Sequence, residues 1–309
     1  MKNVITYSTK LPNAYELEDV LKENRLPPLT ALSAVVHGFV PHPWGDGERF
    51  VLPFEGGYSF AVQTDEKIVP LTLVASKVNE KIKAELAESG RDALSRKEKV
   101  ALKEQVYMEL LPNALHKSRV ILGYYNPEAC LLMLDTSSDS AGSNVIRLLI
   151  KALGTLKATT IHVSDLKMGL QVRLKAYLKE EPLEGTDPFQ GFAVGTDVKL
   201  VGVEKEKVTF AKLDDVFSRR DEILTLLEQN YQVTELALTQ GGTSFRLSSD
   251  FIIKGVKQTT QNDGEWESAY EQFQHESAVK IVLITNIIQG LCSLLGYAED
   301  VEHPEGRPL

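Results

Sequence analysis

The segment 71–110 limits the possible folds most, because it holds two stretches in which apolar residues recur at helical spacing among many charges. Gly90 indicates the end of a first helix over 71–88, and Ser95 with Glu98 matches the capping box that starts a second. The first apolar stripe consists of Leu71, Ala75, Val78, Ile82 and Leu86, and the second of Leu102, Val106 and Leu110. Both stripes are narrow, so we expect a helical hairpin that projects from the body.

The rest of the chain alternates irregularly between expected strands and helices, which favours an α+β fold with irregular mixed sheets over a doubly wound sheet. Residues 49–63 predict a hairpin around a Gly-Gly turn with Pro53 on an edge strand, and 118–136 predict another around Asn-Pro. Asn13 is a candidate N-cap for a helix at 13–24. Other helices are expected at 137–156, 165–179, 213–230 and 265–296, and other strands at 2–9, 158–164, 188–212, 231–238, 243–248 and 250–254.

These elements are expected to form four regions along the chain. They are an N-terminal α+β region at 1–70, the projecting helical hairpin at 71–118, a central α+β region at 119–185 and a C-terminal α+β region at 186–309.

Charge is distributed unevenly over the chain, whose formal net charge is -9. Residues 67–119 hold eleven cations against seven acidic residues, a net +4, and residues 145–179 reach a net +6. On the second helix of the hairpin, Arg96, Lys99 and Lys103 share an arc of about 60° beside the apolar stripe. Clustered cations of this kind attract a polyanion even where the total charge is negative, although charged helix faces are also common as plain solvated surfaces.

No helix-turn-helix, zinc-finger or RNP signature accompanies these cations. If a nucleic acid is the partner, binding is therefore expected through phosphates and without sequence preference. A protein-only interaction module, whose basic hairpin docks on an acidic partner, remains an alternative.

Signatures of enzymes are scarce: there is no P-loop, no G-x-S-x-G and no H-E-x-x-H motif. One carboxylate pattern leaves a Mg²⁺-dependent nuclease open as an alternative, namely Glu55 followed by Asp65 and Lys67 at the end of a strand. His37 and His42 flank a proline-containing loop, where loop packing is a better interpretation than a metal site. We therefore assign no catalytic residue, metal or cofactor.

The two cysteines, Cys130 and Cys292, lie in apolar runs without disulfide or zinc spacing, which fits a reducing cytoplasm. The N-terminus lacks the apolar core of a signal peptide. The most apolar stretch, 278–295, is interrupted by polar residues, so a buried helix is expected there and not a membrane span.

Several segments carry a family resemblance, and they occur in a fixed order along the chain. The central ones are DEKIVP at 65–70 and LKEQVYMELLPNAL at 102–115, and weaker ones follow at ACLLMLDTSS, LLIKALGTL, QGFAV, FAKLDD and VTELAL. Together they resemble the recombination-associated RdgC family of bacteria and their phages. The likeness begins at about residue 60, and the residues before it match poorly.

The resemblance implies a non-enzymatic, cytoplasmic and nucleoid-associated DNA-binding protein that needs no cofactor and no membrane. It implies a head-to-head, tail-to-tail homodimer shaped as a ring, whose basic lumen takes duplex DNA, with binding of single strands left open. It also implies that the protein antagonises the RecA recombinase. The helical hairpin corresponds to the family's finger, and Arg91 lies in its loop within one position of the family's arginine.

The residues expected to contact DNA are the cations of the hairpin, of its flanking segment and of three later positions: Lys77, Lys81, Arg91, Arg96, Lys97, Lys99, Lys103, Lys117, Arg119, Lys151, Lys175 and Lys212. Leu115 stands where the family has an aromatic residue at a ring-closing dimer contact. Near Lys212 the family has A-K-K-Q, whereas this chain has Ala211-Lys212-Leu213-Asp214, so that a second cation and an amide are lost.

Overall fold

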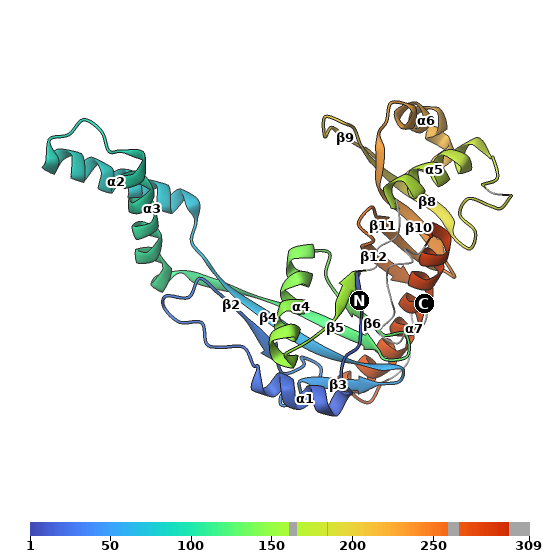
Figure 1. Ribbon diagram of the computed structural model, residues 1–309, viewed down its shortest axis with the longest axis horizontal. Coiled ribbons are helices and arrows are strands. Elements are labelled where there is room, and N and C mark those ends of the chain that lie inside the picture. Colours follow the sequence, from blue (N-terminus) through green and yellow to red (C-terminus); the bar gives the residue numbers. More distant parts are fainter. Residues whose placement is uncertain (161–165, 184, 259–265, 297–309) are drawn as a thin grey trace.

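The computed structural model describes residues 1–160, 166–183, 185–258 and 266–296. Within them, seven α-helices accompany a sheet of twelve strands whose paired neighbours run antiparallel, so the fold is α+β (Figure 1). Ten of these strands form one continuous path and the other two pair beside it, in place of the several irregular mixed sheets that the sequence suggested.

The helices are α1 (Ala14–Glu23), α2 (Leu71–Ser89), α3 (Arg96–Leu110), α4 (Asp139–Leu153), α5 (Leu166–Lys179), α6 (Arg220–Glu228) and α7 (Ala269–Leu295). The strands are β1 (Asn3–Thr9), β2 (Val35–Val40), β3 (Val51–Phe54), β4 (Gly57–Ile68), β5 (Leu115–Asn126), β6 (Leu131–Leu134), β7 (Ala158–Thr160), β8 (Ala193–Val201), β9 (Lys207–Phe210), β10 (Gln232–Gln240), β11 (Thr243–Ser248) and β12 (Ile253–Gln258).

The sheet joins two halves of the protein through β1. Its strand order is β2-β4-β5-β6-β1-β12-β11-β10-β8-β9, with β3 on the edge of β4 and β7 on β1. The longest pairing joins β4 to β5, from Tyr58 opposite Tyr125 to Ile68 opposite Leu115. This ladder continues beyond the core, where β2 pairs with the other edge of β4 from Val35 opposite Glu66 to Val40 opposite Ala61. Only the half of β5 from Ile121 onward is buried.

Two apolar clusters hold the halves together. In the N-terminal half, α1 and α4 pack on the strands through Leu17, Leu21, Val145 and Leu149. In the C-terminal half, α5, α6 and α7 cover one face of β8, β10, β11 and β12. Among the described helices only α7 is long and apolar enough to cross a membrane, and half of its most apolar window is buried, in agreement with the buried helix expected from the sequence.

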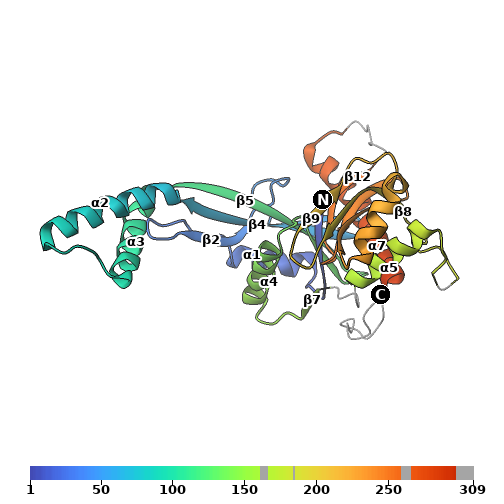
Figure 2. The ribbon, with the colours of Figure 1, turned by 90° about the horizontal axis from the view of Figure 1, so that it is seen from above.

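The molecule has the outline of a crescent (Figure 1). One end is formed by α2 and α3, the other by the strands β8 to β12 with α5 and α6, and β4, β5 and α4 lie between them. We call the side onto which both ends turn the concave side; α1 lies on the opposite, convex side. The view from above shows that β4 and β5 carry α2 and α3 away from the body (Figure 2).

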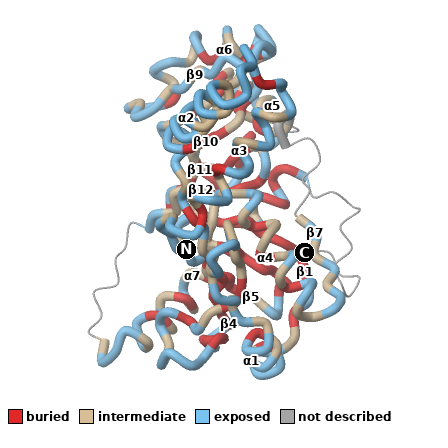
Figure 3. Tube along the Cα trace, turned by 90° about the vertical axis from the view of Figure 1, so that its left-hand side faces the viewer, coloured by how far each residue is buried: buried red, intermediate tan, exposed pale blue. Residues whose placement is uncertain are grey.

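The helices α2 and α3 contact each other, but α3 crosses α2 and does not run back along it (Figures 1 and 2). The capping box expected at Ser95 and Glu98 is present. The expected stripe on α2 is partly wrong, because Val74 is the buried residue of that helix while Leu71 is 73% exposed. The cause is that α3 covers only a short part of α2, so most of both helices stays exposed (Figure 3).

Other expectations are confirmed where capping and turn residues determine the local structure. Asn13 caps α1, both hairpins are present, and Gly56, at a left-handed φ of 85°, makes the turn between β3 and β4. The short strands expected at 188–212 are a long β8 and a short β9, and the strand expected at 250–254 begins at Ile253. The ends of the elements expected at 158–164 and 265–296, together with residues 297–309, lie outside the described residues.

A close backbone approach at Gly38 gives a test of the packing around β2. A Cβ at Gly38 would collide with the Cα of Leu26, so Gly38→Ala should lower the free energy of unfolding by about 1–3 kcal/mol. At Gly169 on α5 the added methyl would meet Leu295 at 3.7 Å, an ordinary contact, and Gly169→Ala should leave stability equal or slightly raised. Urea denaturation followed by circular dichroism measures both, and an unchanged midpoint for Gly38→Ala would contradict the packing described.

Candidate nucleic-acid interface

The twelve cations expected to contact DNA fall into several groups. Seven lie on α2, on α3 or in the loop between them, two lie on β5, and Lys151, Lys175 and Lys212 lie on α4, on α5 and just after β9. On α3, Arg96, Lys99 and Lys103 are all exposed, as their helical spacing requires for one solvent-facing arc. No ion pair ties these three to an acidic side chain in the described part of the chain.

Arg91 lies in the loop between α2 and α3, where two glutamates of these helices hold its side chain in place. Arg91 Nη1 lies 2.8 Å from Glu98 Oε1, and Nη2 lies 3.5 Å from Glu85 Oε1. The hydrogen bond from Arg91, followed by those from Ser95, lowers the pKa of Glu98 to about 2. Arg91 therefore reaches the surface with its charge partly compensated, in contrast to the three cations on α3.

Two further cations of the set form exposed ion pairs. Lys81 binds Glu109 at 2.6 Å, and Lys117 on β5 lies 3.0 Å from Glu66 on β4. Exposed pairs of this type contribute about 0–1 kcal/mol to stability. A phosphate can therefore replace either carboxylate at small cost, and both lysines remain available to a polyanion.

We call the part of β4 and β5 that extends beyond the core the arm. On it, Lys117 and Arg119 lie on the same face of β5, where they line a hollow of about 290 Å³. Arg119 is opposite Thr64, whose Oγ1 lies 2.8 Å from His37 Nδ1. The N-terminal part of α4 closes the other side of the hollow with its N-cap Ser138 and with Ser140 and Asn144. Basic side chains, hydroxyl groups and the N-terminus of a helix together suit an anion.

Sequence reasoning missed Arg147, although it stands one turn before Lys151 on the exposed face of α4. Its Nη1 donates to Asn144 Oδ1 at 3.1 Å, which extends the basic surface from the hollow along α4. The buried face of the same helix carries Gly142, Val145 and Leu149. The helical period of these three residues would have predicted that Arg147 faces solvent.

Sequence reasoning also missed three cations on the C-terminal strands, namely Lys199, Arg246 and Lys254, which surround Glu235. Lys199 and Arg246 alternate with buried neighbours, in Val198-Lys199-Leu200 and Phe245-Arg246-Leu247. This alternation signals one covered and one open face. Lys175, in contrast, lies on α5, which packs on the covered face of these strands.

The residues of the nuclease alternative do not form one site. Glu55 lies in the turn between β3 and β4, whereas Asp65 and Lys67 lie near the far end of β4, roughly 30 Å away at strand rise. Lys67 is buried, and its Nζ donates to Thr30 O at 2.9 Å and Ala31 O at 2.7 Å. Lys67 thus anchors the 30–31 backbone and is not free to orient a water molecule.

The two histidines considered as metal ligands have separate partners. His37 contacts Thr64, while His42 Nε2 lies 3.1 Å from Ser59 Oγ, and His42 Nδ1 accepts from the backbone N–H of Trp44 at 3.3 Å. In the described residues, no group of three or more His, Cys, Asp or Glu side chains is placed to hold a metal ion. Both histidines therefore have structural roles here.

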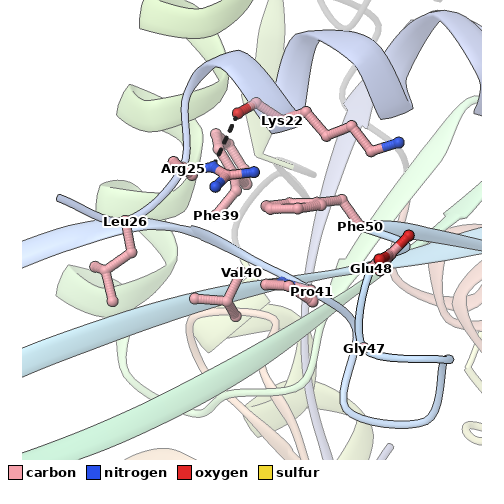
Figure 4. A pocket seen from close by; sticks show the side chains of 9 residues that line it. All are labelled: Lys22, Arg25, Leu26, Phe39, Val40, Pro41, Gly47, Glu48 and Phe50. Carbon is pink, nitrogen blue, oxygen red and sulfur yellow. Dashed lines mark hydrogen bonds between the residues drawn. The ribbon is translucent and has the colours of Figure 1, made fainter.

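A larger pocket of about 590 Å³ lies beside the end of α1 (Figure 4). Arg25 lies 5.8 Å from the centre of the Phe50 ring and donates its Nε to Lys22 O. Lys22 is paired with Glu18 at 2.9 Å. The polar groups of this pocket thus serve the packing of α1, and their arrangement does not point to a reaction.

His42 makes stability depend on pH. Burial lowers its pKa from 6.5 to about 4, so the folded protein keeps the imidazole neutral while the unfolded chain takes up a proton below pH 6.5. Folding therefore loses stability as pH falls from 6.5 toward 4. We expect the drop in unfolding free energy between pH 7 and 4.5 to be about 2–3 kcal/mol smaller in His42→Gln than in the parent chain. Equal pH dependence in urea titrations of both proteins would contradict this.

Comparison with known proteins shows which family this chain resembles. A family model described as "Putative exonuclease, RdgC" matches residues 1–298, so the likeness also extends over the residues before 60. The "Recombination-associated protein RdgC" of Shewanella halifaxensis is 27% identical over 306 residues, covering 95% of this chain and 98% of that protein. The protein of the same description from Neisseria meningitidis serogroup B is 25% identical over 296 residues, 94% of this chain and 95% of that protein.

A third relative, from Aeromonas hydrophila, also carries the description "Recombination-associated protein RdgC". It is 31% identical over 204 residues, which are 65% of this chain and 64% of that protein, just under two thirds. The family model extends over both halves of the sheet and over α2 and α3. The chain therefore belongs to the RdgC family.

Proposed function

We propose that this protein binds duplex DNA through its phosphates, without sequence preference, along the concave side of the crescent. The observation that carries the proposal is the distribution of exposed cations. Exposed cations lie on α3 at one end and on β5 and α4 in the middle, and partly exposed cations lie on the open strand face at the other end, although the whole chain is acidic. A rod-shaped polyanion is the partner that can contact all three places at once.

We further propose that two copies form a ring around the duplex, since one crescent covers only part of its circumference. An apolar patch at the base of α2 supports a contact between copies. Leu115 is 82% exposed, its cross-strand neighbour Ile68 is 46% exposed, and Leu71 follows close by. Exposed apolar side chains gathered at one place favour a protein interface.

A ring on duplex DNA would occupy the surface on which a recombinase filament assembles. The relatives described as recombination-associated support a role in recombination, and we propose that the protein antagonises RecA-type filaments in the cytoplasm, on the nucleoid. Single strands would share the phosphate contacts and are a second substrate in this proposal. A protein-only interaction module is the rival that predicts no DNA retention at low salt.

The description of the family model also names an exonuclease, which makes nuclease activity a second candidate function. The separation of Glu55 from Asp65 and the buried anchoring role of Lys67 give no support to the nuclease site considered from the sequence. We therefore propose a binding protein without catalytic activity, and the binding experiment below reports on both possibilities.

The salt response of binding tests the proposed function. If 6–10 phosphates are contacted, affinity for a labelled 30-base-pair duplex should fall roughly 10³–10⁵-fold between 50 and 200 mM salt. A fluorescence-anisotropy titration measures this, and a flat salt response or no binding at 50 mM would contradict the proposal. Shortening of the same duplex when Mg²⁺ is added would favour the exonuclease.

Reversal of the three exposed cations on α3 tests the face used. The variant Arg96→Glu, Lys99→Glu and Lys103→Glu should abolish DNA retention in a gel shift, because each substitution replaces attraction to phosphate by repulsion. Its folding, checked by circular dichroism, should be intact, since exposed charges contribute little to stability.

Lys22→Glu with Arg49→Glu is the control for this experiment. Both cations are about half exposed, at 45% and 57%, and α1 with its neighbouring loop lies on the convex side. Scored per reversed charge, the control should weaken binding much less. Equal weakening by both variants would mean that overall charge decides and that the α3 face has no special part.

Leu115 tests the contact between copies. Leu115→Asp places a charge in the exposed apolar patch and should shift sedimentation from dimer to monomer, with the fold unchanged because the side chain is 82% exposed. Tyr15→Asp, at an equally exposed position of 87% on the convex helix α1, is the control and should leave the dimer intact. A Leu115→Asp protein that stays dimeric would remove this patch from the interface.

A further inference from the structure

One carboxylate on the C-terminal strands is surrounded by three cations. Lys199 Nζ lies 2.8 Å from Glu235 Oε1, Arg246 Nε lies 3.4 Å from the same oxygen, and Lys254 Nζ lies 3.1 Å from Glu235 Oε2. The four residues come from four neighbouring strands, β8, β10, β11 and β12. Glu235 is 9% exposed, whereas the three cations keep 29–41% of their side-chain surface exposed. We call these four residues the Glu235 cluster.

The strand face that carries the Glu235 cluster is open. On the opposite face, Leu200, Leu236 and Leu247 pack against α5, α6 and α7. Side chains alternate between the faces of a strand, so Lys199 and Arg246 point away from these helices. Figure 1 shows α5 and α7 on the outer side of the strands, which turns the open face toward the concave side.

Charge in the Glu235 cluster is not balanced, because one carboxylate faces three cations. Arg246 and Lys254 are also directly opposite each other on paired strands, an arrangement that destabilises a sheet when both residues carry the same charge. Burial alone would raise the pKa of Glu235, but its hydrogen bonds from Lys199 and Lys254 lower it, so the carboxylate stays ionised. The cluster keeps an excess of two positive charges.

Neighbouring groups on the same face do not cancel this excess. Asp197, two residues before Lys199 on β8, accepts a hydrogen bond at 2.8 Å from the backbone N–H of Lys212. Lys212 is itself a cation, so this pair adds one positive and one negative charge. A sheet that opposes two cations, on a face that none of the described helices covers, is suited to bind an external anion.

We propose that Lys199, Arg246 and Lys254 form a second phosphate-binding surface for the duplex, opposite α3, and that Glu235 holds these cations in position while it limits their affinity. This inference rests on the proposed DNA binding and adds a site to it. Glu235 orders the three side chains before DNA arrives, which reduces the conformational entropy lost on binding. The negative charge of Glu235 at the same time weakens the electrostatic attraction between the three cations and a phosphate.

The inference makes predictions of opposite sign for two substitutions. Lys254→Gln removes one phosphate contact and should lower affinity for the 30-base-pair duplex about five- to tenfold at 100 mM salt, with the salt slope smaller by about 0.9. Glu235→Gln removes the competing carboxylate and should raise affinity severalfold with a steeper salt slope. A cluster that only supports the fold predicts lower stability for Glu235→Gln and unchanged DNA affinity for both.

Lys254→Gln keeps the experiment decisive if Glu235→Gln folds poorly. It relieves the repulsion between Arg246 and Lys254 and leaves Glu235 paired with Lys199 and Arg246. The midpoint temperature of thermal unfolding should therefore be equal to, or higher than, that of the parent chain. Weaker DNA binding by a protein of equal stability supports the inference, and unchanged binding overturns it.

A photocrosslink separates direct contact from a long-range effect of charge. Cys130 and Cys292 are buried, so a thiol-reactive aryl azide should label an introduced exposed cysteine selectively. Ser244→Cys stands two residues from Arg246 on the open face and should crosslink to the duplex. Thr225→Cys, exposed on α6 on the helix side, is the matched control and should not.

The outcomes distinguish a failure of the proposed DNA binding from a failure of the proposed second phosphate-binding surface. If the parent chain does not bind the duplex, the proposed function fails and takes the inference with it. If the parent chain binds with a steep salt response, while Lys254→Gln binds equally well and Ser244→Cys crosslinks no better than Thr225→Cys, then only the inference fails.

Discussion

The pairing of β4 with β5 is the interaction on which the rest of the structure depends. It begins in the core, where Tyr58 faces Tyr125, and it ends at Ile68 and Leu115, where the side chains are exposed. Over its outer half, 115–120, the strand β5 is exposed, so the arm is maintained by the backbone ladder and by few side-chain contacts. The buried Lys67, bound to the 30–31 backbone, ties the neighbouring loop to the same strands. Without this arm, α2 and α3 would have no fixed position relative to the body.

This arm explains how an acidic protein can offer a basic surface. The ladder places α3 at one end of a crescent and leaves the C-terminal strands at the other, each with a face that no helix of the described residues covers. In the proposed binding mode, cations that are far apart in the chain, such as Lys99 on α3, Arg119 on β5 and Lys254 on β12, contact the same duplex. The charge of the whole chain says little about such a surface, because electrostatic attraction of a polyanion depends on where the cations lie.

Strong local signals in the sequence were enough to predict much of the fold. Asn13, Ser95 and the Gly56 turn act within a few residues of themselves, so their effects do not depend on distant packing. The stripe on α2 was mispredicted because burial there is decided by where α3 crosses, which is a tertiary fact. For the same reason the single sheet that joins both halves through β1 could not be read from spacing alone.

In the candidate site, too, some features could be predicted from local sequence and others depended on tertiary packing. The exposed arc of Arg96, Lys99 and Lys103 followed from helical period, whereas the partners of Arg91 and Lys81 required the fold. The Glu235 cluster joins four strands, and its members become neighbours only through register, so scanning a local segment for net charge could not find it. The alternation of single cations with buried residues was the available sign.

Chemical footprinting of lysines tests most directly the central claim that DNA lies along the concave side. Each lysine would be acetylated with and without a saturating 30-base-pair duplex, and its modification read by mass spectrometry. The account predicts protection of Lys99, Lys103, Lys117 and Lys254 together, with Lys22 on the convex side unaffected. Protection spread equally over Lys22 and these lysines, or confined to the convex side, would contradict it.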